Sequence, residues 1–224
     1  MTSESNRGWG PWEALAGLAA LLVGSLVGAQ LLVAFTGTEG LDFKLGAQAI
    51  LAFALVAVAF GFASRHAASA ANALGLRRPG PGWLKTAALG YGAYFLFVIF
   101  VVAVIGEPEQ TDIAEELGFD ENAATAVIAG LLIVVVAPLC EELFFRGFFF
   151  GGLREKLPFP IAAGVSAVLF GLVHLTAANL VAGLQLAFLG LVLAAVYERT
   201  GSLWSSIAIH ATNNALAFTL LVSS

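Results

Sequence analysis

The sequence predicts an all-α protein, a polytopic bundle of transmembrane helices, and three observations support this fold class. Hydrophobic residues make up 59% of the 224 positions, charged residues only 11%, and the mean hydropathy is +0.92. Such a chain has more apolar surface than a soluble core of its length can bury, so lipid must be its solvent. Because a bilayer core offers no water to backbone N–H and C=O groups, only helices or closed barrels span it. The apolar runs are long and lack the alternation of barrel strands, so they predict helices.

Seven apolar runs are long enough to cross a membrane. A hydrocarbon core of about 30 Å needs roughly 20 helical residues at about 1.5 Å each. The runs lie at approximately 12–35, 44–64, 84–106, 122–150, 159–178, 180–197 and 203–222. The first run is longer than the apolar part of a signal peptide, so we expect it to stay as an uncleaved span. Only a few residues around Ala178 and Asn179 join the fifth and sixth runs, where a tight hairpin, a re-entrant segment or an eighth span fits.

The charged residues gather between the runs and predict the orientation of the chain. Basic residues follow the second, fourth and sixth runs, and they are Arg65, Arg77, Arg78, Lys85, Arg154, Lys156 and Arg199. The segment 107–121, after the third run, carries only acidic charges. By the positive-inside rule the even-numbered loops and the N-terminus are cytoplasmic, and the C-terminus is outside. We interpret segment 107–121 as a solvated acidic loop, with a gate over a site as the alternative.

The domain organisation is expected to be simple. The sequence contains no visible internal repeat, low-complexity segment or second domain, so residues 1–224 are expected to form a single integral membrane domain. Its chemistry-bearing core lies at approximately 122–222. The only cysteine, Cys140, rules out an internal disulfide framework and any multi-cysteine metal site.

Ionisable side chains inside apolar runs are the strongest indication of a functional site. Each costs about 2.5–3.5 kcal/mol on insertion scales and usually faces a bundle interior or a water-filled cavity. They occur in CEELFFRGFFF of the fourth run, FGLVHL of the fifth and SIAIHATNN of the seventh. Counted along each helix from its expected cytoplasmic end, these polar groups share one depth band in the inner half to middle of the bilayer. A common site is therefore predicted.

The spacing of residues in the fourth run predicts different roles for its two glutamates. Glu142 and Arg146 are four residues apart, so on a helix they share a face and can form a buried ion pair. Glu141 is turned about 100° from its neighbour and has no local counter-charge, so it is the candidate general base on water. Pro138 precedes the pair and can kink the helix, leaving polar backbone open near the carboxylates.

The other two segments contribute histidines and an asparagine. His174 lies on a run that otherwise has almost no ionisable residue, and His210 and Asn214 are four apart on one helical face. His and Asn are donors suited to a developing oxyanion. A structural reading stays open, because a membrane histidine also serves as an interhelical hydrogen-bond partner. Cys140 is interpreted as buried apolar filler rather than as a nucleophile.

These segments resemble the motifs of a known family. EELFFR resembles the EExxxR motif, FGLVH the FxxxH motif and HATNN the HxxxN motif of the CPBP intramembrane peptidases. This family includes CAAX prenyl endopeptidases of the Rce1 type and Abi-type bacteriocin-processing or immunity proteins. Carried over residue by residue, the resemblance implies that Glu141 and His174 activate the attacking water, and that His210 and Asn214 stabilise the oxyanion.

The resemblance also implies the supporting residues and leaves the metal question open. Glu142 and Arg146 would support the site. Zinc is a possible cofactor, since Glu141, His174 and His210 could supply two histidines and a glutamate with a fourth position open. Against zinc, the sequence has no HExxH helix and the three ligands would come from three helices. We favour a metal-free mechanism.

The function predicted from the sequence is that of an intramembrane endopeptidase. It would hydrolyse a peptide bond of a membrane protein or lipidated peptide, of which a prenylated CAAX-type peptide is one candidate, at the cytoplasmic half of a prokaryotic plasma membrane. The lipid bilayer is the expected surrounding, and no nucleic-acid partner is expected. One alternative is a non-catalytic membrane scaffold or bacteriocin-immunity protein that binds a partner. Another is a transporter with a Glu/His proton relay, which the lack of internal repeats disfavours.

Overall fold

The computed structural model describes residues 7–37, 41–106, 123–175 and 180–223. Within these ranges the regular elements are helical and no strand occurs, which confirms the all-α prediction. In chain order they are α1 (Pro11–Thr36), α2 (Leu41–His66), α3 (Ala70–Leu74), α4 (Trp83–Ile105), α6 (Ala123–Leu131), η1 (Leu132–Val136), α7 (Ala137–Glu142), η2 (Leu143–Phe150), α8 (Gly151–Arg154), α9 (Phe159–Val173), α10 (Leu180–Thr200) and α11 (Leu203–Ser223). The predicted acidic loop 107–121 and the connection at Ala178 and Asn179 lie outside the described residues.

The seven expected spans are matched by five clear ones in the described chain. Helices long and apolar enough to cross a membrane are Pro11–Thr36, Leu45–His66, Trp83–Ile105, Ala126–Arg154 and Leu180–Thr200. The fifth run forms α9, which has only 15 residues. The seventh run forms α11, which has 21 residues, but its polar side chains at His210, Asn213 and Asn214 dilute its apolar character. Crossing of the membrane by α9 and α11 therefore stays a prediction.

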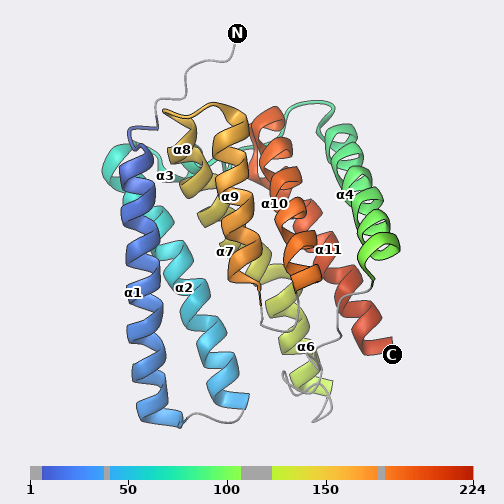
Figure 1. Ribbon diagram of the computed structural model, residues 1–224. Helices are drawn as coiled ribbons and strands as arrows, with labels where there is room; N and C mark the ends of the chain where they lie inside the picture. The colour runs from blue at the N-terminus through green and yellow to red at the C-terminus, as the bar shows by residue number, and fades with distance from the viewer. Residues whose placement is uncertain (1–6, 38–40, 107–122, 176–179, 224) are drawn as a thin grey trace.

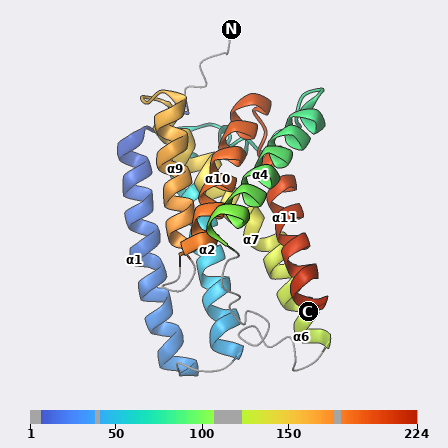
Figure 2. The same ribbon diagram turned by 45° about the vertical axis from the view of Figure 1, so that its right-hand side comes forward.

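The fourth span is the central column of the bundle. It runs without a break from α6 through η1, α7 and η2 to α8, so the expected kink at Pro138 takes the form of a π-helix just before the proline. Around the column, α1 and α2 pack against each other on one side and α9 pairs with α10 on the other (Figure 1). α4 contacts α10 and α11 at the edge of the bundle (Figure 2).

The π-helix η2 is buried on every side. All eight of its residues are buried, and η2 contacts α1, α2, α9, α10 and α11. A helix surrounded in this way belongs at the centre of a membrane bundle. Close approach is possible because α1 has Gly17 at the contact, where an added Cβ would collide with the ring of Phe148. The phenylalanine-rich stretch is therefore packing surface.

The residues before α1 pack against the C-terminal end of the fourth span. Trp9 is 2% exposed, its indole Nε1–H donates to Phe148 O at 3.1 Å, and its ring stacks on the Phe148 ring at 6.0 Å between centroids. Arg7 lies 3.6 Å from the Glu155 carboxylate and donates to the Tyr197 hydroxyl at 3.4 Å. The N-terminal segment thus ties together η2, α8 and α10.

This arrangement predicts that Trp9→Ala strongly destabilises the protein. Truncating a buried tryptophan costs about 3–5 kcal/mol, which lowers the thermal unfolding midpoint by roughly 10 °C for a chain of this size. Trp12→Ala is the matched control, because Trp12 is 80% exposed on the outside of α1. The measurement is thermal unfolding in detergent micelles. Equal midpoints for the two variants would contradict the anchoring role of Trp9.

Candidate active site

The polar residues of the three segments converge inside the bundle around a buried ion pair. Glu142 and Arg146 are both 0% exposed, and Arg146 Nη1 donates to Glu142 Oε1 at 2.7 Å. The guanidinium also donates through Nη2 to Gly190 O at 3.3 Å and lies 4.3 Å from the centroid of the Phe170 ring. The pair predicted from the i, i+4 spacing is present, and it links the central column to α9 and α10.

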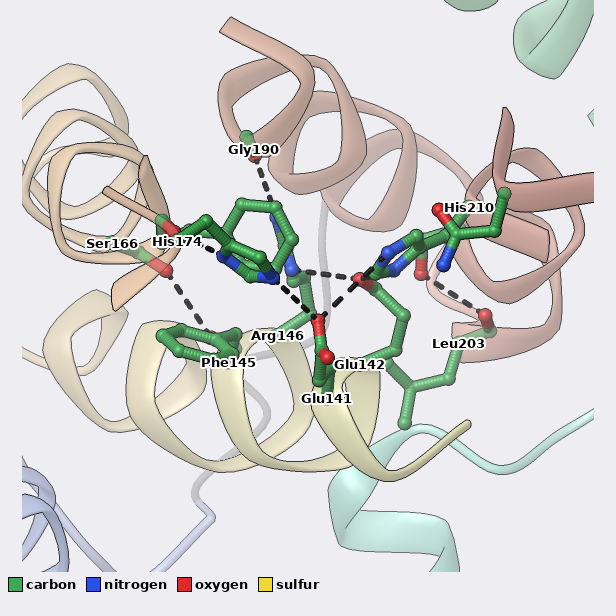
Figure 3. Close-up of polar contacts among 12 residues, drawn as sticks. Glu141, Glu142, Phe145, Arg146, Ser166, His174, Gly190, Leu203 and His210 are labelled. Carbon is green, nitrogen blue, oxygen red and sulfur yellow. Dashed lines mark hydrogen bonds and ion pairs between the residues drawn. The ribbon is translucent and has the colours of Figure 1, made fainter. Parts of the chain in front are cut away.

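His210 joins this pair from α11. Its Nδ1 lies 3.0 Å from Glu142 Oε1, the same oxygen that accepts from Arg146 (Figure 3). A carboxylate paired with a guanidinium can only accept hydrogen bonds, so His210 Nδ1 must carry a proton and donate it. The opposite ring nitrogen, Nε2, lies 3.8 Å from Glu141 Oε2. Glu142 thereby fixes the ring orientation of His210.

His174 is held in a similar way at the end of α9. Its Nδ1 lies 2.7 Å from Phe170 O. A backbone carbonyl is an acceptor, so Nδ1 is protonated and the neutral imidazole presents the lone pair of Nε2. That nitrogen lies 3.6 Å from Glu141 Oε2, so both histidines face the same carboxylate oxygen (Figure 3).

Glu141 lies where the two histidines meet. Its side chain is 16% exposed, and Oε2 is buried without a hydrogen-bond partner. The separations of 3.6 and 3.8 Å from the two Nε2 atoms are too long for direct hydrogen bonds. The unpartnered oxygen of Glu141 and the Nε2 of His174 are therefore two neighbouring acceptors, and a molecule that donates hydrogen bonds would satisfy both.

Asn214 completes the cluster but does not pair with His210. Its Nδ2 donates to Ile133 O of η1 at 3.0 Å. Asn214 lines a pocket of about 300 Å³ together with Glu141 and His174. The remaining walls are mostly apolar side chains of α2, α6 and η1. The structure thus brings Glu141, His174, His210 and Asn214 together, with three of them at one cavity.

Two groups at the pocket were not found from the sequence. Gln48 of α2 is a polar side chain in an otherwise apolar wall, and the carbonyl of Ile133 is a backbone group. Gln48 is a lone amide in the second apolar run, but it is not ionisable and so was not singled out from the sequence. The Ile133 carbonyl has no sequence signal other than the nearby Pro138.

Cys140 also lines the pocket and is a buried free thiol.

The cluster has the ligand types of a zinc site but wider separations between them. The donor set of Glu141, His174 and His210 has suitable chemistry, and each histidine binds an acceptor through Nδ1, as metal ligands do. A tetrahedral zinc with ligands at about 2.0–2.1 Å separates them by about 3.4 Å. The observed 3.6 and 3.8 Å are wider, and the described residues contain no group of three or more His, Cys, Asp or Glu that could hold a metal ion.

Long apolar helices around a buried cluster of glutamates, histidines and an arginine define a polytopic membrane protein with an acid–base site inside its bundle. Comparison with known proteins shows which family this part of the chain is similar to. Residues 123–216 match the family described as type II CAAX prenyl endopeptidase Rce1-like, and they contain the two glutamates, the arginine, the two histidines and Asn214 of the cluster. This part of the chain is therefore similar to the Rce1-like CAAX prenyl endopeptidase (CPBP) family.

One curated protein is also similar to part of this chain. Over 87 residues the chain is 38% identical to a protein of Bacillus subtilis (strain 168) named "Putative membrane peptidase YdiL". The aligned stretch covers 38% of this chain and 34% of that protein, so the chain spans about a third of the relative's length. No solved structure matches the chain.

The buried pair predicts a large difference between two Glu→Gln substitutions. Glu142→Gln leaves the Arg146 charge buried without its carboxylate, and loss of one partner of a buried pair costs about 3–5 kcal/mol. Glu198→Gln is the control, since Glu198 pairs with Arg154 at 2.7 Å but the two side chains are 35% and 28% exposed. Its cost should be about 0–1 kcal/mol. Thermal unfolding compares the two variants, and similar midpoints would contradict the importance of the buried pair.

Proposed function

We propose that the protein is an intramembrane endopeptidase in which Glu141 and His174 activate a water molecule. The observation that supports this most directly is the unpartnered Glu141 Oε2 facing the bare Nε2 of His174 at 3.6 Å beside the pocket. A water donates hydrogen bonds at about 2.7–2.8 Å, so one molecule can reach both acceptors. Its two hydrogens would point to Glu141 and His174, and its oxygen lone pairs would face the pocket.

The charge balance of the cluster supports a distinct role for His210. Two carboxylates and one guanidinium leave one uncompensated negative charge in a buried site, which is costly. One further proton makes the cluster neutral, and His210 lies between the two carboxylates, 3.0 Å from Glu142 and 3.8 Å from Glu141. With that proton on Nε2, His210 can donate to an oxyanion. Asn214 supplies a second donor.

The reaction then balances without any further component. Water transfers a proton to Glu141 as its oxygen bonds to the scissile carbonyl carbon, and the negative charge on the former carbonyl oxygen is stabilised by His210 and Asn214. The proton on Glu141 passes to the amide nitrogen as the C–N bond breaks. A positioned acid–base group contributes about 10²–10⁴-fold, and one oxyanion donor about 10²–10³-fold. Glu142 and Arg146 hold His210 in place.

The pocket and its surroundings favour a membrane-associated substrate. Its walls are apolar side chains of α2, α6 and η1, and the cleavage groups lie at one side of it. An extended peptide with a large apolar or lipidated residue suits such walls, so a prenylated CAAX-type peptide is the first substrate to test. The family of residues 123–216 favours the same class.

We also propose the placement of the protein in the membrane. A single integral domain of residues 1–224 would lie in a prokaryotic plasma membrane with its N-terminus in the cytoplasm. The basic residues support this orientation, because Arg7, Arg77 and Arg154 bind groups at the same end of the bundle, where α8 ends and α11 begins. In this orientation the pocket would lie at the middle of the bilayer and toward its outer half, because its walls come from residues 45–55 of α2 and 129–137 of the central column, away from the basic end.

Glu141→Gln should abolish peptide cleavage while the protein stays folded. The amide cannot take a proton from water, so kcat should fall by at least about 10³-fold, with little change in the unfolding midpoint because Glu141 Oε2 has no hydrogen bond to lose. The assay follows cleavage of a prenylated CAAX-type peptide in proteoliposomes by mass spectrometry. Glu198→Gln is the matched control and should cleave like the wild type. Retained cleavage by Glu141→Gln would contradict its role as the base, whereas a wild type that cleaves no peptide would favour the alternative of a binding scaffold.

Chelation should leave the activity of the purified protein within twofold of its starting value. The donor separations of 3.6 and 3.8 Å are wider than the roughly 3.4 Å between the ligands of a tetrahedral zinc, and the proposed mechanism routes no step through a metal. Activity is measured before and after treatment with a strong chelator, and the metal content by elemental analysis. Stoichiometric zinc whose removal abolishes cleavage, and whose return restores it, would overturn the metal-free mechanism.

A further inference from the structure

A backbone carbonyl in the fourth span lacks a donor within its own helix. In η1 the N–H of Ala137 donates to Leu132 O, five residues back. The next residue, Pro138, has no N–H to give. Ile133 O therefore receives no hydrogen bond from either position that could supply one along the column. An unpaired carbonyl in an apolar bundle is costly, so it needs a partner from another helix.

Asn214 is that partner. Its Nδ2 lies 3.0 Å from Ile133 O, a contact that joins residues 81 positions apart. Ile133 and Asn214 both line the pocket that contains Glu141 and His174. The contact therefore lies at the proposed reaction centre and not at a remote helix crossing.

The carbonyl determines which way the Asn214 amide faces. A carboxamide has an oxygen that accepts and an NH₂ group that donates twice. Reversal of the amide would bring its oxygen against Ile133 O, which places two acceptors together without a hydrogen. The NH₂ group thus stays on the side of Ile133, with one hydrogen used and the second free. A fixed donor of this kind requires no reorganisation when charge develops on a substrate oxygen.

We propose that Pro138 is a positioning residue that frees the Ile133 carbonyl in order to orient the Asn214 amide toward the substrate oxygen. This inference rests on the proposed peptidase function for its kinetic consequence only. Pro138 itself touches no reacting atom in this scheme. It acts by withholding an N–H, and Asn214 is the residue through which the effect reaches the reaction.

The test restores the missing donor. Pro138→Ala supplies an N–H that can bond within the column and release Asn214, so kcat should fall about tenfold while KM changes less than twofold. The unfolding midpoint should stay equal or rise, because a proline inside a helix is unfavourable. Pro138→Val, closer to proline in volume, serves if the alanine variant folds poorly at the buried site. Pro160→Ala is the control, since Pro160 is exposed in the first turn of α9.

A double-mutant cycle separates this role from simple bending of the helix. In an Asn214→Ala background, Pro138→Ala should cause no further loss of kcat, because its effect passes through the missing amide. Unchanged kcat in Pro138→Ala, or a full additional loss in the Asn214→Ala background, would overturn the proposal.

A measurement that does not need activity distinguishes this proposal from the proposed function. The side-chain amide signal of Asn214 in a ¹⁵N–¹H spectrum, identified by its loss in Asn214→Ala, should shift in Pro138→Ala. The signal of Asn213 should move far less and serves as the internal reference. A shift in a protein without peptidase activity would leave the positioning contact standing and refute the peptidase. An unshifted Asn214 signal would overturn the positioning role whatever the activity.

Discussion

The buried ion pair between Glu142 and Arg146 is the interaction on which the rest of the site depends. Both side chains are fully buried, and an uncompensated charge in such a place would be very costly. The pair is stable here because the guanidinium has further partners, the Gly190 carbonyl at 3.3 Å and the Phe170 ring at 4.3 Å. Those partners belong to α10 and α9. One charge pair therefore determines how the central column meets two neighbouring helices, and it also sets the orientation of His210.

The shape of the fourth span is the second constraint. A regular α-helix would satisfy its carbonyls internally and would have none left for contacts across the bundle. The two π-helices and Pro138 change this, because they shift the hydrogen-bond pattern and remove one donor. Departures from regular backbone inside a membrane are tolerated only where protein or a cavity satisfies the freed groups. Asn214 meets that requirement at Ile133 O, beside the pocket.

Much of this arrangement could be predicted from the sequence, and the remainder could not for physical reasons. Apolar runs of about 20 residues with few charged side chains can be recognised in the sequence, so the helices were placed nearly correctly. The Glu142–Arg146 contact follows from i, i+4 spacing. Hydropathy does not distinguish an α-helical from a π-helical backbone, so the π-helices were not predicted. The apolar run at 159–178 also continues past Val173, so hydropathy did not show that α9 ends there. The contact of Trp9 with Phe148 O joins distant segments, and no local pattern encodes it.

The two adjacent glutamates show how one short segment can support opposite requirements. Glu142 is fully buried, and one of its oxygens accepts from both Arg146 and His210, so it is held as a permanent acceptor. Glu141, one position earlier, is turned toward the pocket, where its Oε2 has two histidine nitrogens nearby and no hydrogen bond. A base must be able to gain and lose a proton, which a carboxylate locked to a guanidinium does poorly. The strength of the first pairing is therefore what leaves the second carboxylate free to react.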